Sequence, residues 1–328
     1  MQAYWMQMSE SSSVLELRTS DVPQPGATQL RVRMRAASLN RGEFLAAHGL
    51  HGEPGSWKAI GGEGAGEVVA VGADVTRFKV GDRVMGRCAG AFAEQALMEE
   101  AEAMAAPPEL SWEEAASIPL TFLVAYDMLV LQGLLRAGEW LLVNGVSSGV
   151  GVASLQLAKS LGAKVIGTSG SAGKLARLAP LGLDVALASR QPDFASAVMD
   201  ATDGLGANLV VNTVGGTVFA ENIRCMAFEG RLATVGYVDG VVHADLDLAA
   251  LHAKRLTLFG VSNKLRSKAQ RAAAVPGFVA DVVPHFATGR IRPQVDEVFG
   301  FGDLAQAKAR MEAGGHVGKI VLRMPGSD

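Results

Sequence analysis

The stretch "VNGVSSGVGVASLQLAKSLGAKVIGTSG", residues 143–170, decides the fold of the middle of the chain. An apolar strand enters a turn of small residues, a helix with an apolar stripe follows, and a second apolar strand closes the unit. This order is that of a dinucleotide-binding unit, in which small residues let backbone N–H groups approach a pyrophosphate. Val146 and Ser148 occupy two of the three usual glycine positions, so the turn alone also fits an ordinary corner between buried elements.

Strands and helices alternate on both sides of this stretch. Ser111, with Glu114 three residues later, has the pattern of a capping box that opens a helix. Beyond it, apolar strands such as "EWLLVNG" and "ANLVVNTVG" are separated by predicted helices over 149–161, 172–178, 194–201 and 218–227. Continuous apolar strands alternating with helices predict an α/β Rossmann fold with a doubly wound parallel sheet.

The two ends of the chain have a different pattern. Residues 28–36 alternate between apolar side chains and arginines, which predicts a half-buried antiparallel strand. Residues 61–86 combine short β-branched runs with glycine turns, and "GKIVLRM" near the C-terminus predicts a closing strand. We therefore expect one mainly β domain from residues 1–120 and 261–328 and a Rossmann domain from residues 121–260.

Composition excludes several classes of protein. The 328 residues are 49% hydrophobic and 19% charged, with a net charge of −3, which fits a globular protein and offers no basic surface for nucleic acid. The N-terminus lacks the pattern of a secretory signal, and the apolar run 118–135 is interrupted by polar residues, so we expect a buried helix and no membrane span. Only two cysteines occur, Cys88 and Cys225, which suits the cytoplasm and argues against disulfides.

The end of the second strand bears on the choice of cofactor. An NAD site usually places a carboxylate there, on the ribose 2′-hydroxyl, but no acid occurs between Lys164 and Asp184. Ser169, Ser171 and Lys174 can instead donate to a 2′-phosphate, although a lone helix lysine is more often simply solvated. The pattern favours NADPH, with the Ser148 hydroxyl as a further phosphate donor.

The segments "AASLNRGEF", "GGEGAGEVVAVGADVTRFKVGDRVMG", "AASIPLTFLVAY" and "VNGVSSGVG" occur in an order that resembles the medium-chain dehydrogenase/reductase superfamily. The resemblance is to its zinc-free quinone oxidoreductase branch, which includes ζ-crystallin, and it covers nearly the whole chain. It implies a GroES-like catalytic domain, a Rossmann cofactor domain and a homodimer joined along the strand "RLTLFGV".

The resemblance also implies roles for individual residues. Asn40 matches the asparagine of the branch's Asn-x-x-Asp motif near the nicotinamide, and Glu43 replaces its aspartate. The implied cofactor contacts are Gly149, Val150 and Gly151 at the pyrophosphate, Ser171 and Lys174 at the 2′-phosphate, and Arg190 next to a position that often contacts the adenosine. Val214 and Gly215 match a loop beside the cofactor, Gly236 and Tyr237 match a strand end near it, and Asn263 is expected at the nicotinamide carboxamide.

No metal is expected. Zinc-dependent relatives have a cysteine where this chain has Asn40 and a histidine where it has Gly62, so too few ligands remain for a catalytic zinc. Without a Lewis acid, a conjugated acceptor is favoured over a simple ketone. Asn40 and His51 are the predicted catalytic residues, with His48 as a second possible proton donor, but both histidines also fit surface loop positions.

The sequence thus predicts an NADPH-dependent, zinc-independent oxidoreductase that acts on a quinone or on an α,β-unsaturated carbonyl. The sequence does not distinguish between these two classes of small-molecule substrate. A second possibility is a protein that binds NADPH with weak or no catalysis, because no strong acid–base pair stands out. A zinc alcohol dehydrogenase is the third and the least favoured.

Overall fold

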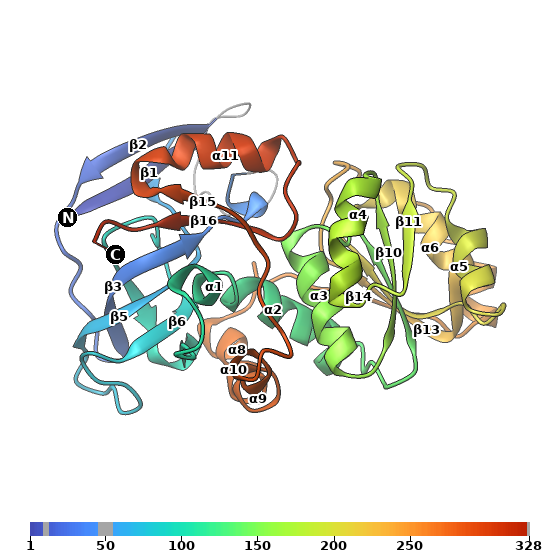
Figure 1. Ribbon diagram of the computed structural model, residues 1–328, viewed down its shortest axis with the longest axis horizontal. Helices are drawn as coiled ribbons and strands as arrows, with labels where there is room; N and C mark the ends of the chain where they lie inside the picture. The colour runs from blue at the N-terminus through green and yellow to red at the C-terminus, as the bar shows by residue number, and fades with distance from the viewer. Residues whose placement is uncertain (9–12, 45–54, 327–328) are drawn as a thin grey trace. The chain divides into compact units, whose positions relative to one another are not determined.

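The computed structural model describes residues 1–8, 13–44 and 55–326. The chain forms two units, one from Met1–Leu123 with Asn263–Asp328 and the other from Val124–Ser262. Figure 1 shows the strands of the first unit in blue, cyan and red, because both ends of the chain contribute to it. The predicted fold class, a Rossmann sheet together with a mainly β unit, is confirmed.

The first unit is built on two sheets. The larger has the strand order β15-β16-β3-β5-β6-β8, with β7 also paired to β3, and the smaller has the order β2-β1-β4. The strands are β1 (Gln2–Met8), β2 (Ser13–Thr19), β3 (Gln29–Ser38), β4 (Trp57–Ala59), β5 (Glu63–Val71), β6 (Arg83–Arg87), β7 (Gln95–Glu99), β8 (Ala103–Ala105), β15 (Val295–Gly300) and β16 (Lys319–Arg323). Strand β16 pairs antiparallel with β3, so the end of the chain completes the sheet that its beginning starts.

Short helices surround these sheets. They are η1 (Arg41–Phe44), η3 (Glu100–Glu102), α1 (Trp112–Ala116), α8 (Lys268–Ala272), α9 (Val275–Asp281), α10 (Val283–Ala287), η7 (Phe301–Asp303) and α11 (Leu304–Glu312), together with the start of α2 (Pro119–Tyr126). The capping box predicted at Ser111 and Glu114 is present at the start of α1. Phe122 in α2 meets Phe286 in α10 edge to face, with ring centroids 5.0 Å apart.

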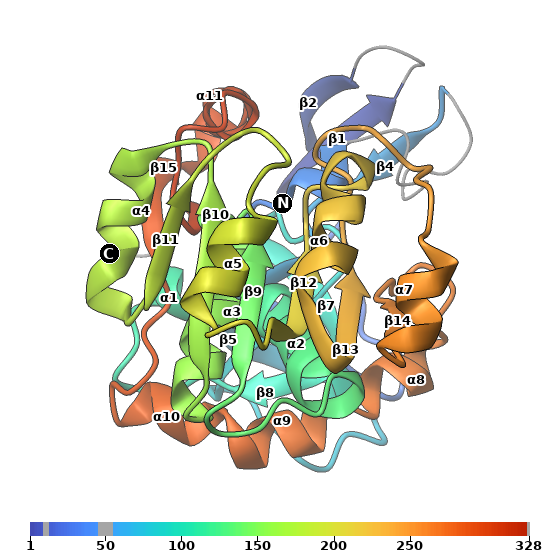
Figure 2. The same cartoon turned by 90° about the vertical axis from the view of Figure 1, so that its right-hand side faces the viewer.

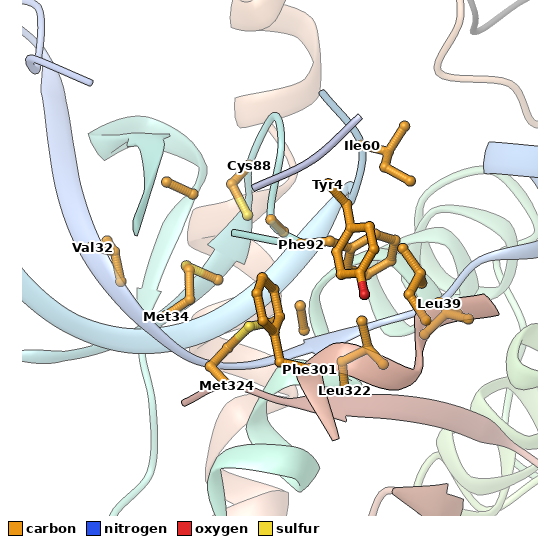
Figure 3. Packing of buried hydrophobic residues seen from close by; sticks show 14 of the residues in the cluster. Tyr4, Val32, Met34, Leu39, Ile60, Cys88, Phe92, Phe301, Leu322 and Met324 are labelled. Carbon is orange, nitrogen blue, oxygen red and sulfur yellow. The ribbon is translucent and has the colours of Figure 1, made fainter. Parts of the chain in front are cut away.

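The alternation in β3 has the predicted consequence. Leu30, Val32 and Met34 are fully buried, whereas Arg33 on the opposite face is exposed. Figure 3 shows Val32 and Met34 in the core of this unit, together with Tyr4 and Phe301, whose rings lie 5.3 Å apart. The core is therefore shared between the first strands and the last elements of the chain.

The second unit is a six-stranded parallel sheet in the order β11-β10-β9-β12-β13-β14. Its strands are β9 (Trp140–Asn144), β10 (Lys164–Ser169), β11 (Val185–Ala188), β12 (Ala207–Asn212), β13 (Met226–Thr234) and β14 (Thr257–Gly260). Its helices are η4 (Asp127–Gln132), α3 (Gly149–Ser160), α4 (Ala172–Leu178), η5 (Ala179–Leu181), α5 (Ala195–Ala201), η6 (Gly216–Val218), α6 (Phe219–Cys225) and α7 (Leu248–Ala253). Helices α3 and α4 cover one face of the sheet, and α5 and α6 lie side by side on the other (Figures 1 and 2).

Two predicted helices differ from the structure. The helix expected over 218–227 ends at Cys225, because Met226 and Ala227 already belong to strand β13. The apolar run 118–135 forms α2 and then the π-helical turn η4, in which Met128 and Leu129 are buried and Leu131 is exposed. Leu134, beyond η4, is exposed as well, so the second half of the run is only partly buried. None of the helices within the described ranges is long and apolar enough to cross a membrane.

Strand β14 lies at one end of the parallel sheet within the described chain. It belongs to the segment "RLTLFGV", at which the sequence predicts contact with a second copy. An edge strand can pair with another chain, but this contact concerns a partner molecule, and the homodimer stays a prediction.

Candidate functional site

The turn after β9 is shaped by a few close backbone contacts. A Cβ atom at Gly151 would lie 2.5 Å from the Gly145 carbonyl oxygen, so the first turn of α3 lies directly against the strand end. Gly145 itself has a φ of +73°, which favours glycine. Ser148 has ordinary extended backbone angles. Glycine is therefore required at 145 and 151 and not at 148.

Ser148 caps helix α3. Its hydroxyl accepts a hydrogen bond from Gly151 N at 3.1 Å and donates one to the Gly145 carbonyl at 2.9 Å. Both bonds hold the turn together, and a direct bond from this hydroxyl to a phosphate stays a prediction. The backbone N–H groups of Gly149 and Val150 lie in the first turn of the helix, where no intrahelical acceptor is available and the helix dipole favours an anion.

The predicted 2′-phosphate residues come together at the carboxyl end of β10. Ser171 caps α4 by accepting a hydrogen bond from Lys174 N, and its own N–H donates to the Ser169 hydroxyl, each at 3.4 Å. The Arg190 side chain packs across Gly170, and its Nε lies 3.5 Å from the Gly170 carbonyl. Two hydroxyl groups and the Arg190 side chain thus lie at this strand end, and Lys174 is in the first turn of the helix that follows it.

The nearest acid in sequence lies at the opposite edge of the sheet. Asp184 precedes β11, which runs parallel to β10. Its carboxylate binds Lys159 Nζ at 2.8 Å and Val165 N at 2.7 Å, at the amino end of β10. Asp184 is therefore not placed to bind a ribose at the carboxyl end of β10.

Most of the other predicted cofactor contacts lie in the loops that follow β12 and β13. Asn212 Oδ1 accepts hydrogen bonds from Val214 N and Gly215 N, each at 3.0 Å, which fixes the loop after β12. Gly236 lies against Thr213, and the adjacent Tyr237 is exposed. Asn263 belongs to the other unit, where its Oδ1 accepts a long bond from Arg266.

One residue at this edge was missed from the sequence. Asn144 ends β9, is fully buried, and has no partner for either side-chain amide atom among the described residues. Buried amides are nearly always hydrogen-bonded. Together with the open N–H groups of α3, this polar edge fits a nucleotide cofactor.

The first unit contains a buried polar cluster centred on Glu63. Its Oε1 accepts hydrogen bonds from Ser38 Oγ at 2.6 Å, Asn40 Nδ2 at 2.9 Å and Lys319 Nζ at 2.9 Å, and its Oε2 accepts one from Leu120 N at 2.7 Å. The side chain of Glu63 is 0% exposed and that of Lys319 is 6% exposed. This is a buried ion pair in which the carboxylate is surrounded by donors.

Lys319 also binds the Asn40 side chain. Its ammonium donates to Asn40 Oδ1 at 2.7 Å and to the Leu39 carbonyl at 2.9 Å, in addition to Glu63. Asn40 Nδ2 donates to both Glu63 Oε1 and, at 3.3 Å, Glu43 Oε1. Asn40 is therefore fixed by three ionisable side chains, those of Lys319, Glu63 and Glu43.

Sequence reasoning missed Lys319. It begins the strand "KIVLR", where alternation assigns it to the same face as Arg323 and hence to solvent. In the structure its neighbours in the strand are buried on both faces, and Lys319 is turned inward. Lys319 is turned inward because it pairs with the buried Glu63, and no local sequence pattern around either residue reveals that pairing.

Glu43 occupies the space beside Gly62. A Cβ atom at position 62 would lie 2.5 Å from Glu43 Oε1, and the Gly62 N–H hydrogen-bonds to this carboxyl. Part of the side chain reaches the surface, but the Oε2 atom is buried and no donor from the described residues reaches it. Burial raises the pKa of Glu43 from 4.5 to about 7; Lys319 opposes the rise, and the nearby Glu63 carboxylate adds to it.

A catalytic zinc does not fit these residues. Zinc needs at least three nitrogen, sulfur or carboxylate ligands in tetrahedral geometry. The Asn40 amide is engaged on both sides, both Glu63 oxygens already accept hydrogen bonds, and Glu43 fills the place of a side chain at 62. Within the described parts of the chain, no group of three metal-binding side chains comes together.

His48 and His51 lie outside the described residues, so their assignment as proton donors stays a prediction. Cys88 is buried, and burial, together with the Glu63 and Glu43 carboxylates, raises the pKa of its thiol. Cys88 is therefore not a reactive thiolate at neutral pH.

Both units match models of known families. Residues 26–108 match the alcohol dehydrogenase GroES-like domain, and residues 149–275 match the zinc-binding dehydrogenase domain. A quinone oxidoreductase of Pseudomonas aeruginosa is 32% identical over 311 residues, which cover 94% of this chain and 95% of that protein. A phenolphthiocerol/phthiocerol polyketide synthase protein of Mycobacterium tuberculosis is 33% identical over 92% of this chain, but the match spans only 14% of the synthase protein.

Solved structures give the same result. A mycobacterial protein solved in complex with NADPH has a TM-score of 0.87 and 28% identity, with 98% of this chain and 100% of that chain covered. The CurK enoyl reductase has a TM-score of 0.85 and 25% identity, with 99% and 100% covered.

Fold and site together define an oxidoreductase built from a GroES-like unit and a Rossmann unit. More specifically, the chain belongs to the quinone oxidoreductase branch of the medium-chain dehydrogenase/reductase superfamily. The resemblance seen in the sequence is thereby confirmed.

The Glu63–Lys319 pair gives a first prediction. Replacing Lys319 with methionine should lower the free energy of unfolding by about 3–5 kcal/mol, because it leaves the Glu63 carboxylate buried without its cation. The double variant Lys319→Met/Glu63→Gln should recover part of this loss. Urea denaturation followed by circular dichroism measures both, and equal stability of the two variants would contradict the role given to the ion pair.

Glu43 gives a second prediction, on pH. An acid whose pKa is higher in the folded than in the unfolded protein makes folding less favourable as pH rises between the two values. With a rise from 4.5 to about 7 and about 1.4 kcal/mol per pKa unit, Glu43→Gln should gain up to about 3 kcal/mol over the wild type between pH 5 and pH 8. Glu109→Gln, which removes an exposed carboxylate, is the control. If the difference in unfolding free energy between Glu43→Gln and the wild type did not change with pH, folding would not raise the pKa of Glu43.

Proposed function

We propose that this protein is an NADPH-dependent, zinc-independent reductase of conjugated carbonyl compounds, either quinones or enones. The observation that carries the proposal is the group of Ser169, Ser171, Lys174 and Arg190 after β10, together with the absence of an acid in the sequence between Lys164 and Asp184. Hydroxyl and cationic groups there suit a 2′-phosphate and would leave the 2′-hydroxyl of NADH without its usual acceptor.

The turn before α3 supports the same proposal. The N–H groups of Gly149 and Val150 at the start of the helix would hold the pyrophosphate, and Gly151 allows the close approach. The loop of Val214 and Gly215 and the strand end at Gly236 and Tyr237 would position the rest of the cofactor. When bound, NADPH supplies a hydride. The structural neighbour solved with NADPH is consistent with this choice.

The buried cluster bears on the choice of acceptor. Because its residues do not fit zinc, no Lewis acid polarises a simple ketone. A quinone or an enone needs less assistance, since conjugation spreads the negative charge onto oxygen, and the protein then has to position the acceptor and supply hydrogen bonds. Among the similar proteins are a quinone oxidoreductase and an enoyl reductase.

Direct assay tests the proposal. Purified protein should oxidise NADPH in the presence of at least one member of a panel of benzoquinones, naphthoquinones and cyclic enones, followed by the loss of NADPH absorbance. Turnover should be unchanged after treatment with a chelator, and metal analysis should find no zinc in stoichiometric amount. Tight NADPH binding without turnover on the whole panel would instead favour a binding protein, and loss of activity with the chelator would favour a zinc enzyme.

The cofactor assignment gives a separate prediction. Lys174→Glu should weaken NADPH binding about 30-fold or more, because a charge-assisted contact worth about 2 kcal/mol becomes a repulsion, and should affect NADH much less. Arg177→Glu makes the same change of charge three residues further along α4 and is the control. Isothermal titration with both dinucleotides distinguishes them. Equal weakening of NADPH and NADH by Lys174→Glu would remove Lys174 from the 2′-phosphate site.

A further inference from the structure

Two loops of the Rossmann unit follow neighbouring strands of its parallel sheet. Strands β12 and β13 pair in parallel (Figure 2), so the β12 loop, residues 213–218, and the β13 loop, residues 235–242, begin at the same edge of the sheet. Four of the predicted cofactor contacts belong to these loops, namely Val214, Gly215, Gly236 and Tyr237. The way in which the loops are joined therefore determines the geometry of this part of the proposed cofactor site.

Asp239 joins the two loops through its side chain. Its Oδ2 accepts hydrogen bonds from Thr217 N at 2.9 Å and from Thr217 Oγ1 at 2.6 Å, both in the β12 loop. Its Oδ1 accepts a hydrogen bond from Val241 N at 2.8 Å, in the β13 loop. One carboxylate oxygen thus binds each loop, and both oxygens are satisfied.

Backbone hydrogen bonds join the same loops beside this carboxylate. Asp239 N donates to the Val214 carbonyl at 2.9 Å, and Gly216 N donates to the Val241 carbonyl at 2.9 Å. Gly215 has a φ of +129° and a ψ of −149°, a conformation that essentially only glycine adopts, and a Cβ atom there would collide with Asp239 Oδ1. The carboxylate therefore packs directly against backbone that is predicted to contact the cofactor.

The donors around Asp239 keep its carboxyl ionised. Burial alone would raise the pKa of Asp239, but the hydrogen bonds from Thr217 and Val241 outweigh burial and hold the pKa below 3.8. Hydrogen bonds to an ionised acceptor are roughly twice as strong as those between neutral groups. A carboxylate at position 239 is therefore a stronger link between the loops than an amide would be.

Asn212 stabilises only one of the two loops. Its side chain binds the N–H groups of Val214 and Gly215 and the Gly215 carbonyl, all within the β12 loop. The hydrogen bonds described above that cross from one loop to the other come from Asp239 and from the backbone beside it. Loss of the Asp239 carboxylate should therefore loosen the β13 loop while Asn212 still holds the β12 loop.

We propose that Asp239 is a positioning residue for the nicotinamide half of the cofactor and holds the β13 loop against the β12 loop before the cofactor binds. This inference rests on the proposed function. Loops that are already ordered lose less conformational entropy when NADPH binds, and they fix the orientation of the nicotinamide ring. Asp239 acts through the backbone of Val214 and Gly215. The adenosine half of the cofactor, proposed to lie at the carboxyl end of β10, does not depend on it.

Asp239→Asn tests this link with little change in size. An amide accepts hydrogen bonds at its oxygen and not at its nitrogen, so the variant loses its bonds either to Thr217 or to Val241. Thr217→Val removes only the hydroxyl donor. Asp200→Asn removes an exposed carboxylate near the end of α5 in the same unit and is the matched control.

The first measurement is isothermal titration with NADPH and with 2′,5′-ADP, which has the adenosine and the 2′-phosphate but no nicotinamide. We expect Asp239→Asn to raise the Kd for NADPH about 10-fold or more and to leave the Kd for 2′,5′-ADP nearly unchanged. Thr217→Val should have a smaller effect on NADPH. The double variant should bind NADPH no more weakly than Asp239→Asn, because both changes break the same link.

Hydrogen exchange of the protein without cofactor gives a readout that does not depend on binding or turnover. In Asp239→Asn, the amides of Thr217 and Val241 should exchange faster than in the wild type, whereas the amides of strands β9 and β12 should keep their protection. At saturating NADPH, kcat should also fall, because looser loops orient the nicotinamide less well.

Several outcomes would overturn the inference. They are unchanged NADPH binding or unchanged exchange in Asp239→Asn, equal weakening of NADPH and 2′,5′-ADP, and an equal loss in Asp200→Asn. A wild type that binds NADPH no more tightly than 2′,5′-ADP would also overturn it and would leave the proposed function intact, since the nicotinamide half would then gain no affinity from these loops. A wild type that binds neither ligand contradicts the proposed function itself.

Discussion

The first unit depends on one ion pair, between Glu63 in β5 and Lys319 in β16, which are 256 positions apart in the chain. Taking both charges out of water is costly, and the cost is offset only because each is surrounded by specific partners. Ser38, Asn40 and the Leu120 N–H complete the shell of Glu63. The ion pair therefore ties the C-terminal strand, the strand β5 and the start of α2 to one point, and Asn40 and Glu43 take their positions from it.

The two units use polar groups in opposite ways. In the Rossmann unit the first-turn N–H groups of α3 have no intrahelical acceptor and the Asn144 amide has no partner among the described residues, which leaves an edge able to accept an anionic ligand. In the GroES-like unit almost every polar atom of the cluster is satisfied internally, and the exception among the described residues is a single carboxyl oxygen. The polar groups of the Rossmann unit are thus available to a ligand, whereas those of the GroES-like unit hold the Glu43 carboxyl in place.

Features that depend on neighbouring residues in the chain were predictable from the sequence. Periodicity indicated the buried face of β3, and small residues followed by a helix indicated the turn at Ser148. The absence of an acid after β10 led to Ser171 and Lys174; Ser171 caps α4 at Lys174 N, and the role of both residues at a phosphate stays a prediction. Lys319 was not predictable, because its inward direction depends on a glutamate far away in the sequence, and the packing of Glu43 against Gly62 is equally non-local. The end of α6 was missed for another reason: β13 begins two residues early and overrides helix propensity.

The contact between Glu43 and Gly62 also constrains how this chain can change. A side chain at position 62 would require the Glu43 carboxyl to move from its present place. Because Oε1 is the end of a flexible side chain, a side chain at position 62 would turn the carboxyl away from Asn40 and the Gly62 N–H without disturbing the backbone around it. Position 62 therefore controls where the carboxyl at position 43 lies, although no local sequence pattern connects the two residues.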